Sequence, residues 1–196
     1  MSLILASASS ARRHMLSSAG VSFAVVPSHA NERSAKATYR AGGMPPHAQA
    51  EALAELKALS VSSEKEGLVI GADQMLAVGG QVMDKPQDIA EARAHLEMLR
   101  GKTHELLTAV VVSRGKEIIW RHLDAPRLTM RDFSDAFLND YMQRAGKSTL
   151  RSVGAYQLEG LGAQLFDRVE GDYFSVLGLP LLPLLAFLRE QGIVAR

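Results

Sequence analysis

The stretch LILASASSARRH, residues 3–14, passes from a short apolar run directly into hydroxyl side chains and two adjacent arginines. The run 3–6 predicts a buried strand, and residues 10–19 predict a helix. The turn between them gathers hydrogen-bond donors from Ser7, Ser9, Arg12 and Arg13. Free N–H groups at a helix N-terminus, hydroxyls and guanidinium groups all donate to phosphate oxygens. The stretch therefore predicts a strand–turn–helix unit that binds a phosphate-bearing ligand.

The composition is that of an ordinary globular enzyme of 196 residues, with 47% apolar and 22% charged residues. Its 22 basic and 21 acidic residues nearly cancel, so no overall positive field favours a nucleic-acid partner. The absence of cysteine excludes disulfides, thiolate metal sites and a cysteine nucleophile. No segment has the pattern of a signal peptide or the length of a membrane span. We therefore expect a cytoplasmic protein with no membrane partner.

Strand and helix patterns alternate early in the chain, and a long β-hairpin is predicted later, from residues 106–113 and 117–130. GLVIGAD, residues 67–73, is typical of a buried strand that ends on an acid. Residues 28–46 show no period and predict a long loop, either functional or a mobile surface insertion. The order favours an α/β fold: a mixed twisted sheet with flanking helices and two lobes around a deep cleft.

Asp73 is the strongest candidate for a chemical role, because a polar residue after a buried strand lies at the mouth of the ligand crevice in α/β proteins. Lys57 lies on a helix predicted from Pro45 or Pro46 to about Ser60, and Lys85 follows a predicted hairpin. Both cations could converge on Asp73. Nearby lysines would make Asp73 a poor base alone, and a bound Mg²⁺ would compensate. The alternative interpretation is a capping or ion-paired aspartate.

Several common catalytic patterns are absent. The opening segment lacks the Gly-rich spacing and the GK[ST] ending of a Walker loop, and no GxSxG elbow is present. The six histidines form no HExxH motif and no pair at i, i+4, which disfavours a histidine-based metal site. In GAYQLEG, residues 154–160, Gln157 and Glu159 lie between glycines and could read a base edge. The alternative is that they are ordinary polar residues of a turn.

Six motifs in this order and spacing resemble the Maf family of nucleoside triphosphate pyrophosphatases: LASASSARR, GADQ, DKP, GKTH, GAYQLEG and EGDYFSVLGLPL. The resemblance covers nearly the whole chain and implies one Maf-like domain over residues 1–196. It further implies an α/β fold with a deep cleft, similar to that of the inosine triphosphate pyrophosphatases, and a homodimer. The implied activity is metal-dependent hydrolysis of a nucleoside triphosphate to the monophosphate and pyrophosphate.

The resemblance also implies roles for individual residues. Ser7, Ser9 and Arg12 match the family's phosphate-binding opening, whereas Arg13 would bind phosphate or only support the turn. Asp73 matches the proposed proton acceptor. The two phosphate-facing lysines correspond to Lys57 and Lys85, and the metal, Mg²⁺ or Mn²⁺, would be held by Glu32 and Asp73. The sequence departs from the family around Glu32, and it has Ser at residue 10 where proline is usual.

Three positions that tune base choice in the family align with Ala11, Gln74 and Glu159. Gln74 and Glu159 resemble the branch that prefers 7-methyl-GTP. Ala11 fits neither that branch, which has a tryptophan there able to stack on a cationic base, nor the branch that prefers dTTP and UTP. The expected function is therefore an NTP pyrophosphatase that removes surplus or modified nucleotides such as 7-methyl-GTP. The alternatives are a dTTP- or UTP-preferring enzyme and a non-catalytic nucleotide-binding regulator of septum formation.

Overall fold

The computed structural model describes residues 2–195, and the chain divides into two compact units. Unit 1 comprises residues 2–74, 108–124 and 173–195, and unit 2 comprises residues 75–107 and 125–172. The described residues form seven α-helices and one mixed sheet of eight strands in the order β2-β1-β3-β5-β7-β8, with β4 paired to β3 and β6 to β5. The α/β class and the mixed sheet expected from the sequence are confirmed. The deep cleft and the single domain over residues 1–196 stay predictions.

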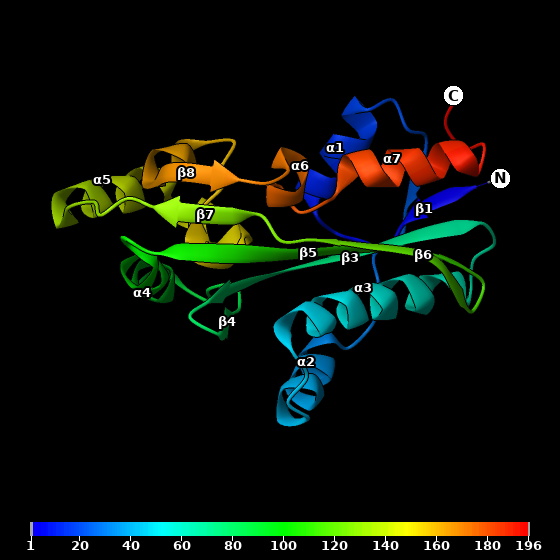
Figure 1. Ribbon diagram of the computed structural model, residues 1–196, viewed down its shortest axis with the longest axis horizontal. Helices are drawn as coiled ribbons and strands as arrows, with labels where there is room; N and C mark the ends of the chain where they lie inside the picture. Colours follow the sequence, from blue (N-terminus) through cyan, green and yellow to red (C-terminus); the bar gives the residue numbers. More distant parts are fainter. Residues whose placement is uncertain (1, 196) are drawn as a thin grey trace. The chain divides into compact units, whose positions relative to one another are not determined.

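Unit 1 contains the parallel part of the sheet (Figure 1). Strand β1 (Leu3–Leu5) lies between β2 (Ala24–Val25) and the first part of β3 (Leu68–Val78). The second part of β5 (Thr103–Arg114) forms an antiparallel hairpin with β6 (Glu117–Asp124). The strand predicted at residues 3–6 is confirmed in place.

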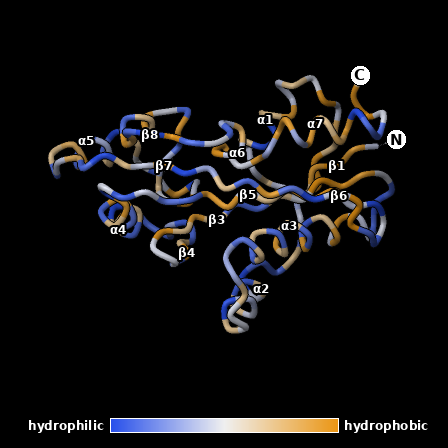
Figure 2. The backbone as a smooth tube through the Cα atoms, in the orientation of Figure 1, coloured by the Kyte–Doolittle hydropathy of each residue, from blue (hydrophilic) through white to orange (hydrophobic). Residues whose placement is uncertain are grey.

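Helices cover both faces of the sheet in unit 1. Figure 1 shows α1 (Ser10–Ser18) and α7 (Leu181–Glu190) on one side and α3 (Pro46–Ser62) on the other. The apolar side chains of β1 alternate between the two core clusters. Leu3 and Leu5 pack with residues of α1 and α7, whereas Ile4 packs with Val61 of α3. The hydrophobic colouring of β1 in Figure 2 follows from this, because a strand covered on both faces needs apolar residues at every position.

Unit 2 holds the antiparallel part of the sheet. The end of β3 turns through Gly79 and Gly80, both with positive φ, into β4 (Gln81–Met83), as the sequence predicts. The first part of β5 pairs with β7 (Arg127–Met130), which pairs with β8 (Phe166–Glu170). The helices are α4 (Ile89–Leu99), α5 (Asp135–Ala145) and the 3₁₀ segments η1 (Gly146–Arg151), η2 (Val153–Ala155) and η3 (Leu161–Leu165).

The long loop predicted over residues 28–46 is wrong, because residues Glu32–Ala41 form helix α2. The Asn31 side chain caps this helix by accepting a hydrogen bond from the Ser34 N–H. None of its residues is buried. Good helix formers and a capping residue therefore specify α2, without the buried apolar stripe by which amphipathic helices are recognised.

Two strand boundaries also differ from the predictions. Strand β3 does not end at Asp73 but continues to Val78, so this acid lies within the strand. The segment 117–130 is not one strand, because Ala125 and Pro126 separate β6 from β7. Proline has no N–H to donate to a ladder. None of the described helices is both long and apolar enough to cross a membrane.

Candidate active site

The opening segment forms a capped turn in unit 1. Strand β1 ends at Leu5, and Ser9 is the N-cap of α1, where its side chain accepts a hydrogen bond from the Arg12 N–H. The Ser7 hydroxyl accepts a second bond, from the Ser9 N–H, at 3.2 Å. The strand–turn–helix unit predicted from residues 3–14 is therefore confirmed, with Ser7 buried and Ser9 half-buried at the N-terminus of α1.

The Arg12 guanidinium is buried and joins three segments of unit 1. Nε donates to the Gly178 carbonyl at 2.7 Å, and Nη1 donates to the Ala72 carbonyl at 2.8 Å and to the Ser7 hydroxyl at 3.3 Å. Burial lowers the pKa of Arg12, while the carboxylates of Asp73 and Glu32 act in the opposite direction. Arg12 therefore holds the opening turn against β3 and keeps a positive charge beside Asp73. The predicted contact of Arg12 with phosphate would be made in addition to these three hydrogen bonds.

A lysine bridges two carboxylates next to this turn. Lys57 of α3 lies with Nζ 2.6 Å from Oδ1 of Asp73 and 2.9 Å from Oε2 of Glu32. The side chains of Lys57 and Asp73 are 10% and 8% exposed, whereas that of Glu32 is 41% exposed. We call these three residues the carboxylate–lysine cluster. Lys57 thus approaches Asp73, as expected, and α2 contributes an acid to the same ammonium group.

The second carboxylate oxygen of Asp73, Oδ2, is buried and has no hydrogen-bond partner among the described residues. A buried anionic oxygen without a donor is costly, so it is a natural ligand for a cation or a proton. The described residues contain no group of three or more acidic or histidine side chains that could hold a metal alone. The donor set still fits Mg²⁺ or Mn²⁺, which commonly bind one or two carboxylates and complete their shell with water and substrate phosphates.

Gln74 follows Asp73 in β3, and alternation along a strand directs its side chain to the opposite face. Its Nε2 lies 2.9–3.1 Å from Oγ1 of Thr108 and from the carbonyl oxygens of Ser175 and Val176. Carbonyl oxygens cannot donate, so the amide nitrogen must face them and Oε1 must face the other way. At that side lies Gly178 (φ 104°), where an added Cβ would contact Oε1 of Gln74 and Arg12.

Unit 1 therefore brings together most of the predicted site: Ser7, Ser9, Ala11, Arg12, Glu32, Lys57, Asp73 and Gln74. Ala11 is half-buried on α1, and Arg13 is exposed. Lys85 and Glu159 belong to unit 2, where both are exposed, and their approach to the site stays a prediction. No sequence pattern predicted a role for Thr108, Ser175 or Gly178. Gly178 had a signal in the sequence, because a glycine outside a helix or strand, as in VLGLPL, often has a positive φ.

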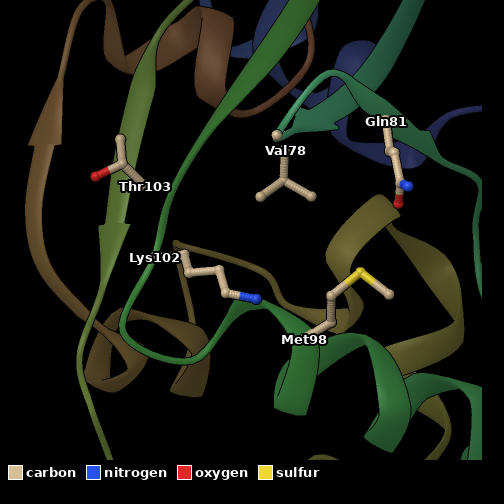
Figure 3. Close-up of a pocket in the computed structure, with 6 residues that line it drawn as sticks. Val78, Gln81, Met98, Lys102 and Thr103 are labelled. Atoms are coloured by element: carbon tan, nitrogen blue, oxygen red, sulfur yellow. The ribbon is translucent and has the colours of Figure 1, made fainter.

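Unit 2 contains a pocket of about 540 Å³ between the β3–β4 hairpin, α4 and the start of β5. Figure 3 shows Val78 and Gln81 on one side of it and Met98 and Lys102 on the other. None of the predicted site residues lines this pocket, so it adds nothing to the candidate site.

Comparisons with known proteins agree with the motifs. The family model for Maf, Maf-like protein, matches residues 2–191. The chain is 52% identical over 194 residues to a nucleoside triphosphate pyrophosphatase of Hyphomonas neptunium, covering 99% of this chain and 98% of the relative. It is 47% identical over 193 residues to a 7-methyl-GTP pyrophosphatase of Rhizobium meliloti, covering 98% and 97%. With a match over nearly its whole length, this chain belongs to the Maf family.

Proposed function

We propose that the protein hydrolyses a nucleoside triphosphate to the monophosphate and pyrophosphate. The observation that carries this proposal is the buried contact between Lys57 Nζ and Asp73 Oδ1, at 2.6 Å, directly beside the Arg12–Ala72 hydrogen bond. A carboxylate that can take a proton and cations that can neutralise phosphates are thereby placed together. Two relatives that are 52% identical to this chain and are named nucleoside triphosphate pyrophosphatase support the same activity.

The chemistry follows from the two oxygens of Asp73. Lys57 occupies Oδ1, so Oδ2 is the oxygen left to accept a proton from the attacking water. Water oxygen forms a bond to the α-phosphorus, and the bond from that phosphorus to the bridging oxygen breaks. Pyrophosphate leaves with the electron pair, and the charge that develops on it is stabilised by Arg12, Lys57 and Lys85.

A divalent cation, Mg²⁺ or Mn²⁺, would be held by Asp73 and Glu32. When bound, it lowers the pKa of its water and neutralises phosphate charge. Support for this assignment comes from the carboxylates of Asp73 and Glu32, which lie on the same ammonium group. The hydroxyls of Ser7 and Ser9 and the N-terminus of α1 would bind the phosphates of the substrate.

The preferred base that we propose is guanine or its 7-methyl derivative, with dTTP or UTP as the alternative. Gln74 uses its amide nitrogen within the protein and can offer only its oxygen to a base. Such an acceptor can bind a ring N–H group, which guanine, uracil and thymine have and which neutral adenine and cytosine lack. The relative named 7-methyl-GTP pyrophosphatase supports the first choice. Ala11 supplies no ring for stacking, so discrimination would depend on Gln74 and Glu159.

We also propose that the enzyme works as a homodimer in the cytoplasm. The resemblance to the family and the composition support both points, and no nucleic acid or membrane is needed for the proposed reaction. Sedimentation at several protein concentrations tests the dimer, which predicts twice the mass of the 21.2 kDa chain.

The test is a panel of nucleotides, 7-methyl-GTP, GTP, dTTP, UTP and ATP, with Mg²⁺ or Mn²⁺ and chromatographic identification of the products. We expect monophosphate and pyrophosphate in equal amounts. Asp73→Asn should lower kcat by about 10²–10⁴-fold, the contribution typical of a positioned base. Absence of pyrophosphate with every nucleotide would contradict the proposal. Calorimetry showing tight nucleotide binding without turnover would instead support the regulator of septum formation.

A further inference from the structure

A buried histidine and tyrosine in unit 2 take no part in the chemistry above. His104 of β5 is 1% exposed, and its Nε2 lies 2.7 Å from the hydroxyl of Tyr156, which is 4% exposed. Burial lowers the pKa of His104 to about 4, so the imidazole is neutral at physiological pH. The other ring nitrogen, Nδ1, is buried and has no hydrogen-bond partner among the described residues.

The direction of this hydrogen bond follows from counting donors. A neutral imidazole has one N–H and the tyrosine has one O–H. If Tyr156 donates to Nε2, only the Nδ1–H of His104 is left without a partner. If Nε2–H donates instead, both the tyrosine proton and the Nδ1 lone pair lack one. The first arrangement satisfies more groups, so Tyr156 donates to His104.

Ring packing holds Tyr156 in one orientation. Its centroid lies 5.6 Å from that of His104 and 4.8 Å from that of Phe166, and the latter pair is edge to face. We call His104, Tyr156 and Phe166 the histidine–tyrosine cluster. Both His104 and Tyr156 are buried, so neither side chain can contact a substrate. Any effect of this cluster on substrate binding must therefore pass through the backbone.

The backbone just before Tyr156 is strained. Gly154 and Ala155 have φ of 76° and 62°, and Ala155 is the one residue other than glycine with positive φ in the described chain. A Cβ at Gly154 would lie 2.7 Å from Leu76 Cδ1 and from a carbon of the Tyr156 ring. A fully buried alanine in the left-handed region persists only where its surroundings over-determine the conformation.

Hydroxyl groups provide that constraint. The Tyr141 hydroxyl donates to the Ala155 carbonyl at 3.1 Å, and the Ser152 hydroxyl donates to the Tyr156 carbonyl. With the bond from Tyr156 to His104, three side-chain hydroxyls hold residues 155 and 156. Strained backbone held this firmly is found most often next to functional sites.

The chain emerges at the surface directly after the cluster. Gln157 and Leu158 are half-buried, and Glu159 and Gly160 are exposed. The Gly160 N–H donates to the Gln157 carbonyl at 3.2 Å, which closes a tight turn. A Cβ at Gly162 would overlap that same carbonyl oxygen. The position of the turn 157–160 is therefore set by the anchored residues 155 and 156 that precede it.

We propose that the buried hydrogen bond between His104 and Tyr156 positions the turn 157–160 for contact with the nucleobase, which makes His104 and Tyr156 positioning residues for base selection. The inference rests on the proposed function, in which Glu159 contributes to the choice of base. It assigns a role to a histidine and a tyrosine that touch neither phosphate nor metal.

The experiment compares 7-methyl-GTP and UTP with ribose 5-triphosphate, a substrate that has no base. In Tyr156→Phe and His104→Leu, we expect KM for the preferred nucleotide to rise about 3–10-fold, the loss expected of one positioned hydrogen bond. Its kcat should stay within about twofold, and the ratio of kcat/KM between the two nucleotides should fall toward one. Turnover of ribose 5-triphosphate should not change, although it would fall in a variant that is merely misfolded.

The matched control is His95→Gln. His95 of α4 also has a buried Nδ1 without a partner among the described residues, but it contacts Glu91 rather than the turn. This control should leave the preference between nucleotides unchanged. In a Glu159→Ala background, Tyr156→Phe should have no further effect on the preference, because the residue that it positions is gone.

Each outcome decides the proposal. Unchanged preference in Tyr156→Phe, or an equal loss with ribose 5-triphosphate, overturns it while leaving the proposed pyrophosphatase intact. If the wild-type protein hydrolyses none of the three substrates, the proposed function fails and the inference fails with it. If Tyr156→Phe unfolds, His104→Leu serves instead, because it removes the acceptor of the same hydrogen bond.

Discussion

The carboxylate–lysine cluster of unit 1 and the histidine–tyrosine cluster of unit 2 place ionisable groups at buried positions on β3 and β5, but they do so in opposite ways. Lys57 and Asp73 form an ion pair, in which each side chain has a partner of opposite sign at 2.6 Å. His104 has no such partner, and burial lowers its pKa to about 4. The first cluster pairs opposite charges, whereas burial favours the neutral imidazole in the second.

The difference separates two kinds of contribution to a site. Charges kept inside a protein can bind phosphates, metals or protons, at the risk of a large loss of stability when one partner is removed. Neutral groups buried away from the substrate, such as His104 and Tyr156, contribute by holding other residues in place. Substitutions that alter one cluster at a time test this difference.

The largest effect on stability is expected for Lys57→Met. The substitution leaves the Asp73 carboxylate buried without its cation, which should lower the free energy of unfolding by about 3–5 kcal/mol. Urea unfolding at neutral pH measures it. A loss below about 1 kcal/mol, the value typical of an exposed ion pair, would show that the buried pair is not needed for stability.

The next effect is a pH dependence due to His104. Its pKa in the folded protein, about 4, is below the unfolded value of about 6.5, so the unfolded state binds more protons between these values. Stability should therefore fall as the pH is lowered from about 6.5 to 4, with roughly 3 kcal/mol from this residue at the end of the range. The measurement is the free energy of unfolding against pH for the wild type and His104→Gln.

The variant isolates the histidine from the carboxylates that titrate in the same range. The difference in stability between wild type and His104→Gln should change with pH only inside that window. Parallel curves for the two proteins would mean that His104 titrates alike in the folded and unfolded states.

A smaller effect is expected from added Mn²⁺ without substrate. A cation at 100 times its Kd raises the free energy of unfolding by about 2.7 kcal/mol. The gain should disappear in Asp73→Asn, in which Oδ2 is no longer part of a carboxylate. Thermal unfolding with and without Mn²⁺ measures this shift, and an equal gain in both proteins would place the cation elsewhere.

The smallest effect is expected for Arg121→Ala. Arg121 pairs with Glu55 at 2.6 Å, as close as Lys57 to Asp73, but its side chain is 55% exposed. Water screens exposed pairs, so the loss should be below about 1 kcal/mol. Urea unfolding beside Lys57→Met then shows how far burial, rather than distance, decides the value of an ion pair. Similar losses in the two variants would contradict this view.

Local patterns predicted the elements that have a buried apolar face or a clear cap. The strand at residues 3–6, the Ser9-capped helix and the Gly79–Gly80 hairpin all form where expected. Helix α2 was missed because it buries no residue and consists mainly of the small, charged and polar residues that are also typical of loops. The extension of β3 beyond Asp73 was missed because a polar residue inside a strand looks like its end.

The sequence by itself determined the class of the fold, the family, and the residue types of the site, because motif spacing and apolar periodicity are local properties. The tertiary structure alone decided how those residues are used. It showed that Lys57 bridges two carboxylates, that Gln74 must present its oxygen, and that His104 is neutral. These facts depend on burial and on hydrogen-bond partners far away in the chain, such as Gly178 for Arg12, and no local pattern encodes them.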